Sequence, residues 1–335
     1  MLRSTFRRTA VLVATAAVAL PLAQYAGTAD AAAPDAKGAR NICSSREPIQ
    51  ASELTDGVST ANCSLVGRLV VSGDMAVVVP LAGHGVQGDG VTTAGGTETP
   101  SLAVENMNGV VTARTDGSLA PEGGTTTAKL SGWPSACNDG SFTYLDAGHA
   151  HKWTTKMRWR YQAGGTPSRF DKAAALKQIQ AGMTNMRSGR DACGLQGTPR
   201  ANSEYLGTTT RAPGVAVKNG TNVCVRSDGR SIVGWGNLVN NLGVTCAWWN
   251  SRGHLYEADM RIKPSSQIVL KYGAGCTNSL DLQSLTTHEW GHAWGLGHVR
   301  NPSLTMHHFL PVCSYAARTL GLGDFRGMKS LYGLR

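Results

Sequence analysis

A stretch near the C-terminal end of the chain, residues 288–298, reads HEWGHAWGLGH. His288 and His292 are four residues apart, so on a helix both side chains project from the same face. Gly295 follows where a helix can end and the chain can turn, because glycine has no Cβ to oppose a left-handed conformation. The turn lets His298 reach back as a third ligand. Three neutral imidazoles with one open coordination position are typical of a catalytic zinc site.

Glu289 supplies the carboxylate that such chemistry requires. It comes directly after the first predicted ligand, so it points toward the open coordination position of the metal. We predict that His288, His292 and His298 bind one Zn²⁺ and that Glu289 is the general base for a zinc-bound water. At this composition, a chance occurrence of the complete pattern has a probability of about one in 50,000. A buried helix with structural histidines is therefore the weaker interpretation.

The pattern HExxHxxGxxH resembles that of the metzincin zinc peptidases, which also have a methionine turn beneath the metal. Met306 stands eight residues after His298, where the resemblance places that turn. It implies that Met306 is not a ligand but packs beneath the histidines. Astacins and serralysins have a tyrosine two residues after this methionine, and His308 takes that position here. Two roles are open for His308: contact with the zinc-bound water or the oxyanion, or lining of the substrate pocket.

Segments around the motif resemble one metzincin family, the matrixins. Residues 257–262 (EADMRI) are similar to the strand before the active-site helix, and residues 281–285 (DLQSL) to the start of that helix. Residues 320–333 are similar to the C-terminal helix and its final Leu-Tyr-Gly. The resemblance covers roughly residues 152–333 and is closest to secreted bacterial matrixin-like proteases. It implies an α+β catalytic domain with a twisted, mostly parallel five-stranded sheet, an active-site helix and a C-terminal helix.

Three departures limit what the resemblance carries over. The PRCGxPD segment that keeps animal matrixins latent through a cysteine has no counterpart here. Cys193, in residues 191–194 (DACG), is only weakly similar to it and lies inside the catalytic part. The His/Asp-rich loop that holds further zinc and calcium ions is missing between Ile262 and Ser279, so no further metal is carried over. The aspartate pair of the last matrixin helix is reduced to Asp324.

Strands and helices are expected on both sides of the motif, to hold it in place. We predict a helix over residues 168–187, capped by Ser168, and strands near residues 153–161, 215–217, 223–225, 232–235, 243–249, 255–262 and 268–272. The motif helix is expected to start at Asn278 or Ser279. A protein or peptide substrate would bind extended by adding itself to a sheet edge, with residues 268–272 as the candidate edge.

The chain before the peptidase part has a different composition. Residues 1–31 combine an arginine-bearing start, an apolar run and an Ala-Asp-Ala site, which is typical of a secretory signal peptide. Residues 32–140 are interpreted as a β-rich N-terminal region and residues 141–335 as the peptidase domain. Within the former, residues 82–100 are rich in glycine and threonine and are predicted to form a long exposed loop. Residues 117–132 are predicted to be a linker or a processing site.

All eight cysteines follow the predicted signal peptide, which indicates disulfide bonds in a secreted, extracellular protein. Many connectivities are possible. Proximity along the chain favours Cys276–Cys313, Cys224–Cys246, Cys43–Cys63 and Cys137–Cys193. No stretch after the signal peptide is apolar and long enough for a membrane span.

Charge is distributed unevenly along the chain. Residues 32–150 contain 6 basic and 12 acidic residues, whereas residues 151–335 contain 23 basic and 9 acidic ones. Opposite charges let the two parts attract each other, which supports an inhibitory pro-region. A retained module that binds cell wall or matrix is the alternative. Scattered basic residues without a reader motif argue against nucleic acid as a partner, and we expect a monomer.

The predicted function is that of a secreted zinc-dependent endopeptidase acting on extracellular proteins. The alternative is a catalytically silent zinc scaffold, or a surface-binding protein whose N-terminal region carries the function. Glu289 favours the enzyme, because a silent scaffold has no need of a general base. His84, His149 and His151 are expected to be surface residues without a defined role.

Overall fold

The computed structural model of the chain describes residues 41–93, 100–115 and 133–335. Residues Asn41–Arg335 belong to one compact unit. The predicted signal peptide at 1–31 and the predicted linker at 117–132 lie outside the described residues. Among the helices of the described residues, none has both the length and the apolar composition of a membrane span.

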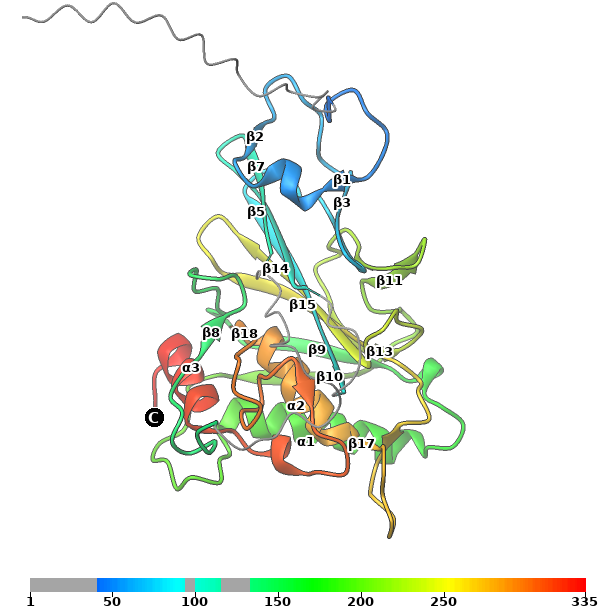
Figure 1. The fold of residues 1–335 in the computed structure, drawn as a ribbon, viewed down its shortest axis with the longest axis vertical. Helices are drawn as coiled ribbons and strands as arrows, with labels where there is room; N and C mark the ends of the chain where they lie inside the picture. The colour runs from blue at the N-terminus through cyan, green and yellow to red at the C-terminus, as the bar shows by residue number, and fades with distance from the viewer. Residues whose placement is uncertain (1–40, 94–99, 116–132) are drawn as a thin grey trace, which may run out of the picture. The chain divides into compact units, whose positions relative to one another are not determined.

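Five strands of the C-terminal part lie side by side in one sheet (Figure 1). Their spatial order is β10 (Ser203–Thr208), β9 (Met157–Gln162), β13 (Ser231–Trp235), β15 (Leu255–Ile262) and β14 (Gly243–Asn250). The first four run parallel, and β14 runs antiparallel to β15. The mostly parallel five-stranded sheet expected from the sequence is therefore confirmed.

Three α-helices accompany this sheet. They are α1 (Lys172–Ser188), α2 (Leu282–Ala293) and α3 (Leu322–Tyr332), and α1 packs against α2. An aspartate caps each of the first two: Asp171 accepts a hydrogen bond from the Ala174 amide, and Asp281 accepts one from the Ser284 amide. Both helices begin a few residues later than predicted, because these carboxylates, and not Ser168 or a residue at 278–279, satisfy the first free amides.

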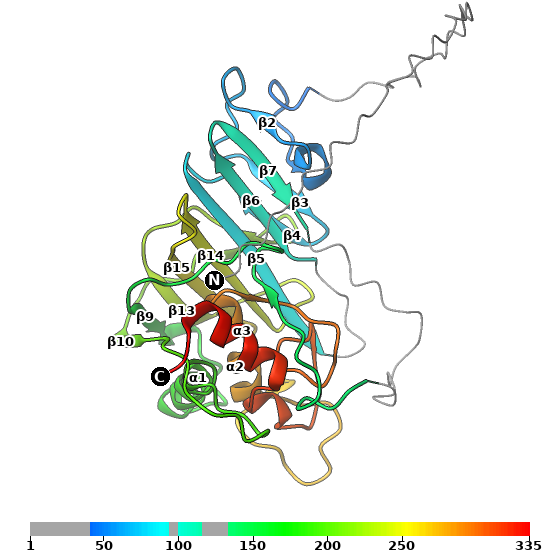
Figure 2. The same cartoon turned by 90° about the vertical axis from the view of Figure 1, so that its left-hand side faces the viewer.

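The sheet does not end at β14 but continues into the N-terminal part of the chain (Figure 2). The further strands are β5 (His84–Thr93), β6 (Leu102–Met107), β7 (Val110–Arg114) and β2 (Val58–Ser59), each antiparallel to its neighbour. β5 pairs with β14 over residues 84–91 and is buried along nearly its whole length. The prediction of a long exposed loop over residues 82–100 is wrong for this strand.

Close approach of other parts of the chain explains why such a glycine-rich stretch forms a buried strand. A Cβ at Gly88 would lie 2.7 Å from Cys224 Sγ, and one at Gly90 would lie 2.7 Å from Asn241 Nδ2. Glycine is needed in this strand because a side chain would collide with neighbouring atoms, whereas in a loop it is needed because its backbone can adopt more conformations. Composition alone does not distinguish these two uses.

A second sheet also joins the two parts of the chain. Its strands, in spatial order, are β1 (Ile49–Gln50), β3 (Leu69–Ser72), β4 (Met75–Val78), β12 (Thr221–Cys224) and β11 (Val215–Lys218). β4, from the N-terminal part, pairs in parallel with β12, from the C-terminal part. The boundary predicted near residue 140 therefore lies between segments of sequence that share two sheets.

Short elements complete the described fold. Two-residue strands form three small pairings: β8 (Thr143–Tyr144) with β18 (Leu296–Gly297), β16 (Ile268–Val269) with β17 (Leu280–Asp281), and β19 (Phe309–Leu310) with β5. Single 3₁₀ turns are η1 (Ala51–Leu54), η2 (Ala163–Gly165) and η3 (Ala316–Arg318). The candidate substrate edge at residues 268–272 is thus only the short strand β16, outside the large sheet.

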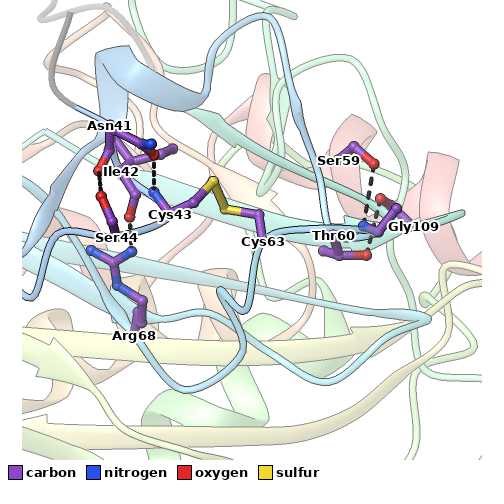
Figure 3. The surroundings of a disulfide bond; sticks show 10 residues. Asn41, Ile42, Cys43, Ser44, Ser59, Thr60, Cys63, Arg68 and Gly109 are labelled. Atoms are coloured by element: carbon purple, nitrogen blue, oxygen red, sulfur yellow. Dashed lines mark hydrogen bonds between the residues drawn. A yellow bond between two sulfur atoms is a disulfide. The ribbon is translucent and has the colours of Figure 1, made fainter.

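All eight cysteines form disulfides, and the pairs are Cys43–Cys63, Cys137–Cys193, Cys224–Cys246 and Cys276–Cys313. The connectivity favoured by proximity is confirmed. Figure 3 shows the first of these bonds beside Arg68, whose guanidinium donates to the Ile42 carbonyl oxygen. None of the four links a cysteine before residue 116 to one after residue 132.

A single backbone cut between residues 116 and 132 is therefore expected to split the denatured chain into two fragments without a reductant. The measurement is a non-reducing denaturing gel after cleavage at a specific protease site inserted there, with the uncut chain as control. Fragments that stay linked until reductant is added would contradict the disulfide topology.

Candidate metal centre

α2 brings the first two histidines of the motif together. Every residue of this helix is buried, and it packs against α1 and β14. His288 and His292 lie one turn apart on the same helical face. The helix ends at Ala293, and Gly295 turns the chain with a φ of +98°. That turn leads through β18 to His298.

Three ring nitrogens meet at one point. His288 Nε2 lies 2.9 Å from His292 Nε2 and 3.2 Å from His298 Nε2. On the other side of the rings, His288 Nδ1 lies 2.7 Å from the Thr305 carbonyl oxygen, and His292 Nδ1 lies 2.9 Å from that of Leu296. Carbonyl oxygens only accept hydrogen bonds, so these Nδ1 atoms carry the hydrogen and the Nε2 atoms present lone pairs. The three side chains can therefore hold a metal ion.

Burial keeps these imidazoles neutral. His288 and His292 are fully inaccessible, and His298 is 7% exposed. Burial lowers the pKa of His288 and of His298 well below the ordinary value, and it lowers the pKa of His292 to about 4. A neutral imidazole keeps its lone pair for a metal, so the cluster is in its ligand form at neutral pH. A set of three neutral nitrogen donors fits zinc.

The Glu289 carboxylate is fully buried and faces β14. Its Oε2 accepts a hydrogen bond of 2.6 Å from Thr245 Oγ1. Gly243, on the same strand, leaves room for this carboxylate, because a Cβ there would overlap it. Burial raises the pKa of Glu289 to about 8, and the hydrogen bond from Thr245 opposes the rise. A carboxyl group with such a pKa can take up and release a proton near neutral pH.

The segment that contains Met306 passes beneath α2. The Met306 side chain packs against Gly291, where a Cβ would overlap it. From α3, the buried Asp324 carboxylate accepts hydrogen bonds from the amides of Thr305 (2.9 Å) and Met306 (3.1 Å). Burial raises the pKa of Asp324 to about 6, and these hydrogen bonds oppose the rise. Because the Thr305 carbonyl oxygen accepts from His288, Asp324 supports the cluster through this segment.

His308 lies beside the cluster and is not part of it. Its ring centroid is 6.1 Å from that of His298 and 4.2 Å from that of Phe309. Burial lowers its pKa to about 3, so the ring is neutral. Its backbone oxygen accepts a hydrogen bond from the Thr92 amide of β5. Both roles predicted for His308 stay predictions.

Asp89 is a residue of this site that the sequence did not single out. It lies on β5 and is fully buried, with Oδ1 3.2 Å from His298 Nδ1 and Oδ2 3.4 Å from His292 Nδ1. An aspartate between two glycines, far from the motif along the chain, has no spacing that marks it as a metal-site residue. Only the pairing of β5 with β14 brings it here.

A second cluster of metal-ligand types consists of Glu105, Asp146 and His151. The Arg114 guanidinium lies 2.7 Å from Glu105 and 2.5 Å from Asp146, and it forms an ion pair with each of these carboxylates. His151 Nε2 is 3.2 Å from Asp146, so the group is an ion-pair network. The prediction that His151 is a surface residue is wrong, because it is 5% exposed; His149 is exposed as predicted.

Residues 140–333 match the family model for the matrixins, Peptidase M10. The match covers more than half of the chain and includes the three histidines. The chain belongs to the matrixin family. Matrixins are zinc-dependent endopeptidases, so the resemblance stated from the sequence is confirmed. No curated protein sequence matches the chain.

This matrixin has no thiol that could approach the metal. Cys193, whose surroundings are weakly similar to the cysteine segment of latent matrixins, is bonded to Cys137. The other six cysteines are paired as well. Any latency in the oxidised protein must therefore use another kind of group.

Replacing Asp324 by asparagine is expected to lower the free energy of unfolding by about 1–3 kcal/mol, because an amide NH₂ cannot accept from the buried backbone amides. The matched control is Asp171→Asn, since asparagine caps a helix about as well as aspartate does. Chemical denaturation of the two variants beside the wild type measures the effect. Equal losses in both would contradict the support assigned to Asp324.

Proposed function

We propose that this matrixin is a secreted zinc-dependent endopeptidase that cleaves extracellular proteins. The observation that carries the proposal is the convergence of three buried Nε2 atoms, with Glu289 on the same helix as two of them. Each imidazole is neutral, and the Nδ1 atoms of two of them are held by carbonyl oxygens. Such a set is prepared for a metal before the metal arrives.

The chain's own residues divide the work of peptide hydrolysis. When bound, zinc would polarise the peptide carbonyl and lower the pKa of an attacking water. His288, His292 and His298 would hold the ion through their Nε2 atoms. Glu289 removes a proton from the attacking water and then delivers it to the leaving amine. Thr245 orients the Glu289 carboxylate through its hydrogen bond of 2.6 Å.

β14 is the strand along which a substrate is expected to bind. It is the last of the five catalytic strands and carries Thr245 and Gly243, both of which face Glu289. An extended peptide would pair through backbone hydrogen bonds with the edge of β14 opposite β15, the edge that β5 occupies in this structure. Secretion is supported by the four disulfides, which persist in oxidising compartments, and by the sequence of residues 1–31.

The competing function is that of a zinc scaffold without activity. A buried carboxyl group is costly to retain unless it is used or paired. Glu289 keeps its place beside the histidines, with one hydrogen bond from Thr245 and a strand glycine making room for it. This arrangement favours the enzyme.

Replacing Glu289 by alanine is expected to lower kcat for casein or a peptide substrate by about 10²–10⁴-fold, because the general base is lost. Zinc content should stay at one ion per chain, since all three ligands remain. The control is Glu204→Ala, which removes a half-exposed carboxylate on β10. Equal activity of wild type and Glu289→Ala in a zinc-loaded preparation would overturn the mechanism.

His308→Phe separates the two roles predicted for that side chain. From its place beside Phe309, we expect KM to change several-fold while kcat and its pH profile stay the same, because a pocket residue affects binding. Steady-state kinetics over a range of pH measure this. A fall in kcat together with a changed pH profile would instead assign His308 to the chemical step.

A further inference from the structure

We propose that a pocket between the two parts of the chain binds the carboxyl-terminal residue of a peptide, with an aliphatic side chain inside the pocket and the terminal carboxylate at Arg226. The pocket has a volume of about 220 Å³. Residues 78–81, between β4 and β5, form one wall, and Arg226, Trp248 and Tyr256 belong to the other. The N-terminal part and the C-terminal part therefore each supply one side of the site.

This pocket lies on the face of the large sheet opposite α2. Side chains alternate between the two faces along a strand. On β14, Ala247 and Trp249 pack in the core that contains α2. Trp248, between them, packs in the second core with Val86 of β5. The pocket is thus separate from the histidine cluster, and a ligand can bind there without a metal.

One side of the pocket is apolar. Val78, Pro80 and Leu81 form it, and Leu81 is 55% exposed. His84 also lines the pocket, and its ring meets that of Tyr256 edge-on with 5.6 Å between the centroids. Sites for drug-sized molecules are about 300–1,000 Å³, so this pocket has room for one side chain and not for a long acyl chain. An aliphatic side chain seated there would cover exposed apolar surface.

Arg226 places a positive charge at the pocket without a paired carboxylate. It is exposed, and within residues 41–93, 100–115 and 133–335 no acidic group forms an ion pair with it. Asp228, two residues further on, is paired with Arg211 and Arg230 instead. The Arg226 guanidinium lies over Gly67, where a Cβ would be 3.2 Å from Nη2. A guanidinium binds a carboxylate through two parallel hydrogen bonds, so a carboxyl terminus matches this group.

A second hydrogen-bond donor at the pocket has no acceptor. Trp248 is only 2% exposed, and among the described residues no atom accepts a hydrogen bond from its indole Nε1. A buried indole N–H usually has an acceptor, which a ligand oxygen would supply. A fatty acid has its only acceptors at the carboxylate, whereas the last residue of a peptide also has a peptide carbonyl oxygen close by. Two separate donors, Arg226 and Trp248, therefore favour the peptide.

The acidic residue next to Tyr256 on β15 does not leave a free acceptor for these donors. The Glu257 carboxylate accepts hydrogen bonds from Ser227 Oγ and from the amides of Asp228 and Gly229. Burial raises the pKa of Glu257, and these hydrogen bonds oppose the rise. Because its oxygens already have partners, an incoming carboxylate is left to pair with Arg226.

The two-sided construction of the pocket has a consequence for the whole chain. A ligand that contacts both walls binds the assembled protein and not its separated parts, so it stabilises the assembly. The N-terminal part then serves as one half of a binding site for peptide ends.

The experiment uses the full chain with Glu289→Ala, which prevents self-cleavage, and with isotope-labelled tryptophan. The indole signal of Trp248 is the one that disappears from the magnetic resonance spectrum of Trp248→Phe. The ligands are acetylglycyl-leucine with a free carboxyl group, its carboxamide, and hexanoate. Calorimetric titration with the same ligands compares the parent with Arg226→Gln and Arg252→Gln. Arg252 is the matched control, an exposed arginine in the turn after β14 that does not line the pocket.

We expect acetylglycyl-leucine to shift the Trp248 indole signal. It should bind at least about tenfold more tightly than its carboxamide, because the charged hydrogen bonds to Arg226 need the carboxylate. Arg226→Gln should remove this preference, and Arg252→Gln should keep it. No binding, equal binding of acid and carboxamide, or a preference that persists in Arg226→Gln would overturn the site. Hexanoate that binds as tightly as the peptide would overturn the assignment to a peptide end.

Discussion

The exclusion of water from three histidine side chains is the constraint on which the rest of this structure depends. A polar group can be buried only if its hydrogen-bonding atoms find partners. His288 and His292 find them in the carbonyl oxygens of Thr305 and Leu296, and His298 lies against Asp89. With Nδ1 engaged, each ring presents Nε2 to the same point. Burial then keeps the rings neutral, which is the form that a metal requires.

Each surrounding element can be understood as a support for that cluster. α1 packs against α2 and keeps the motif helix buried. The turn at Gly295 directs the chain back toward the helix, and α3 holds the Met306 segment through Asp324. β14 provides Thr245 for Glu289 on one face and an edge for an extended peptide. Glu289, the proposed base, is therefore held in place by a residue of β14, so its position depends on where β14 lies in the sheet.

The N-terminal part adds strands to the catalytic sheet and brings Asp89 to the histidines. In matrixins that use a cysteine for latency, a thiolate blocks the metal. Here every cysteine is in a disulfide, and the Asp89 carboxylate of β5 lies at the Nδ1 atoms of His292 and His298, which is the side of the rings away from the converging Nε2 atoms. Two kinds of contact hold the N-terminal part against the catalytic part: the backbone hydrogen bonds between β5 and β14, and apolar packing between the two parts. The acidic N-terminal part and the basic C-terminal part add a favourable long-range attraction.

The sequence by itself determined the family and much of the catalytic fold, and it singled out the residues of the proposed zinc site. His288, Glu289 and His292 follow helical spacing, and local spacing is preserved in any fold that forms the helix. Apolar runs predicted the strands, and closeness of the cysteines along the chain predicted the disulfide pairs. Only the tertiary structure placed Asp89 at the histidines and turned a glycine-rich stretch into β5. That pairing joins residues far apart in the chain, and no local pattern encodes which distant edge a strand will choose.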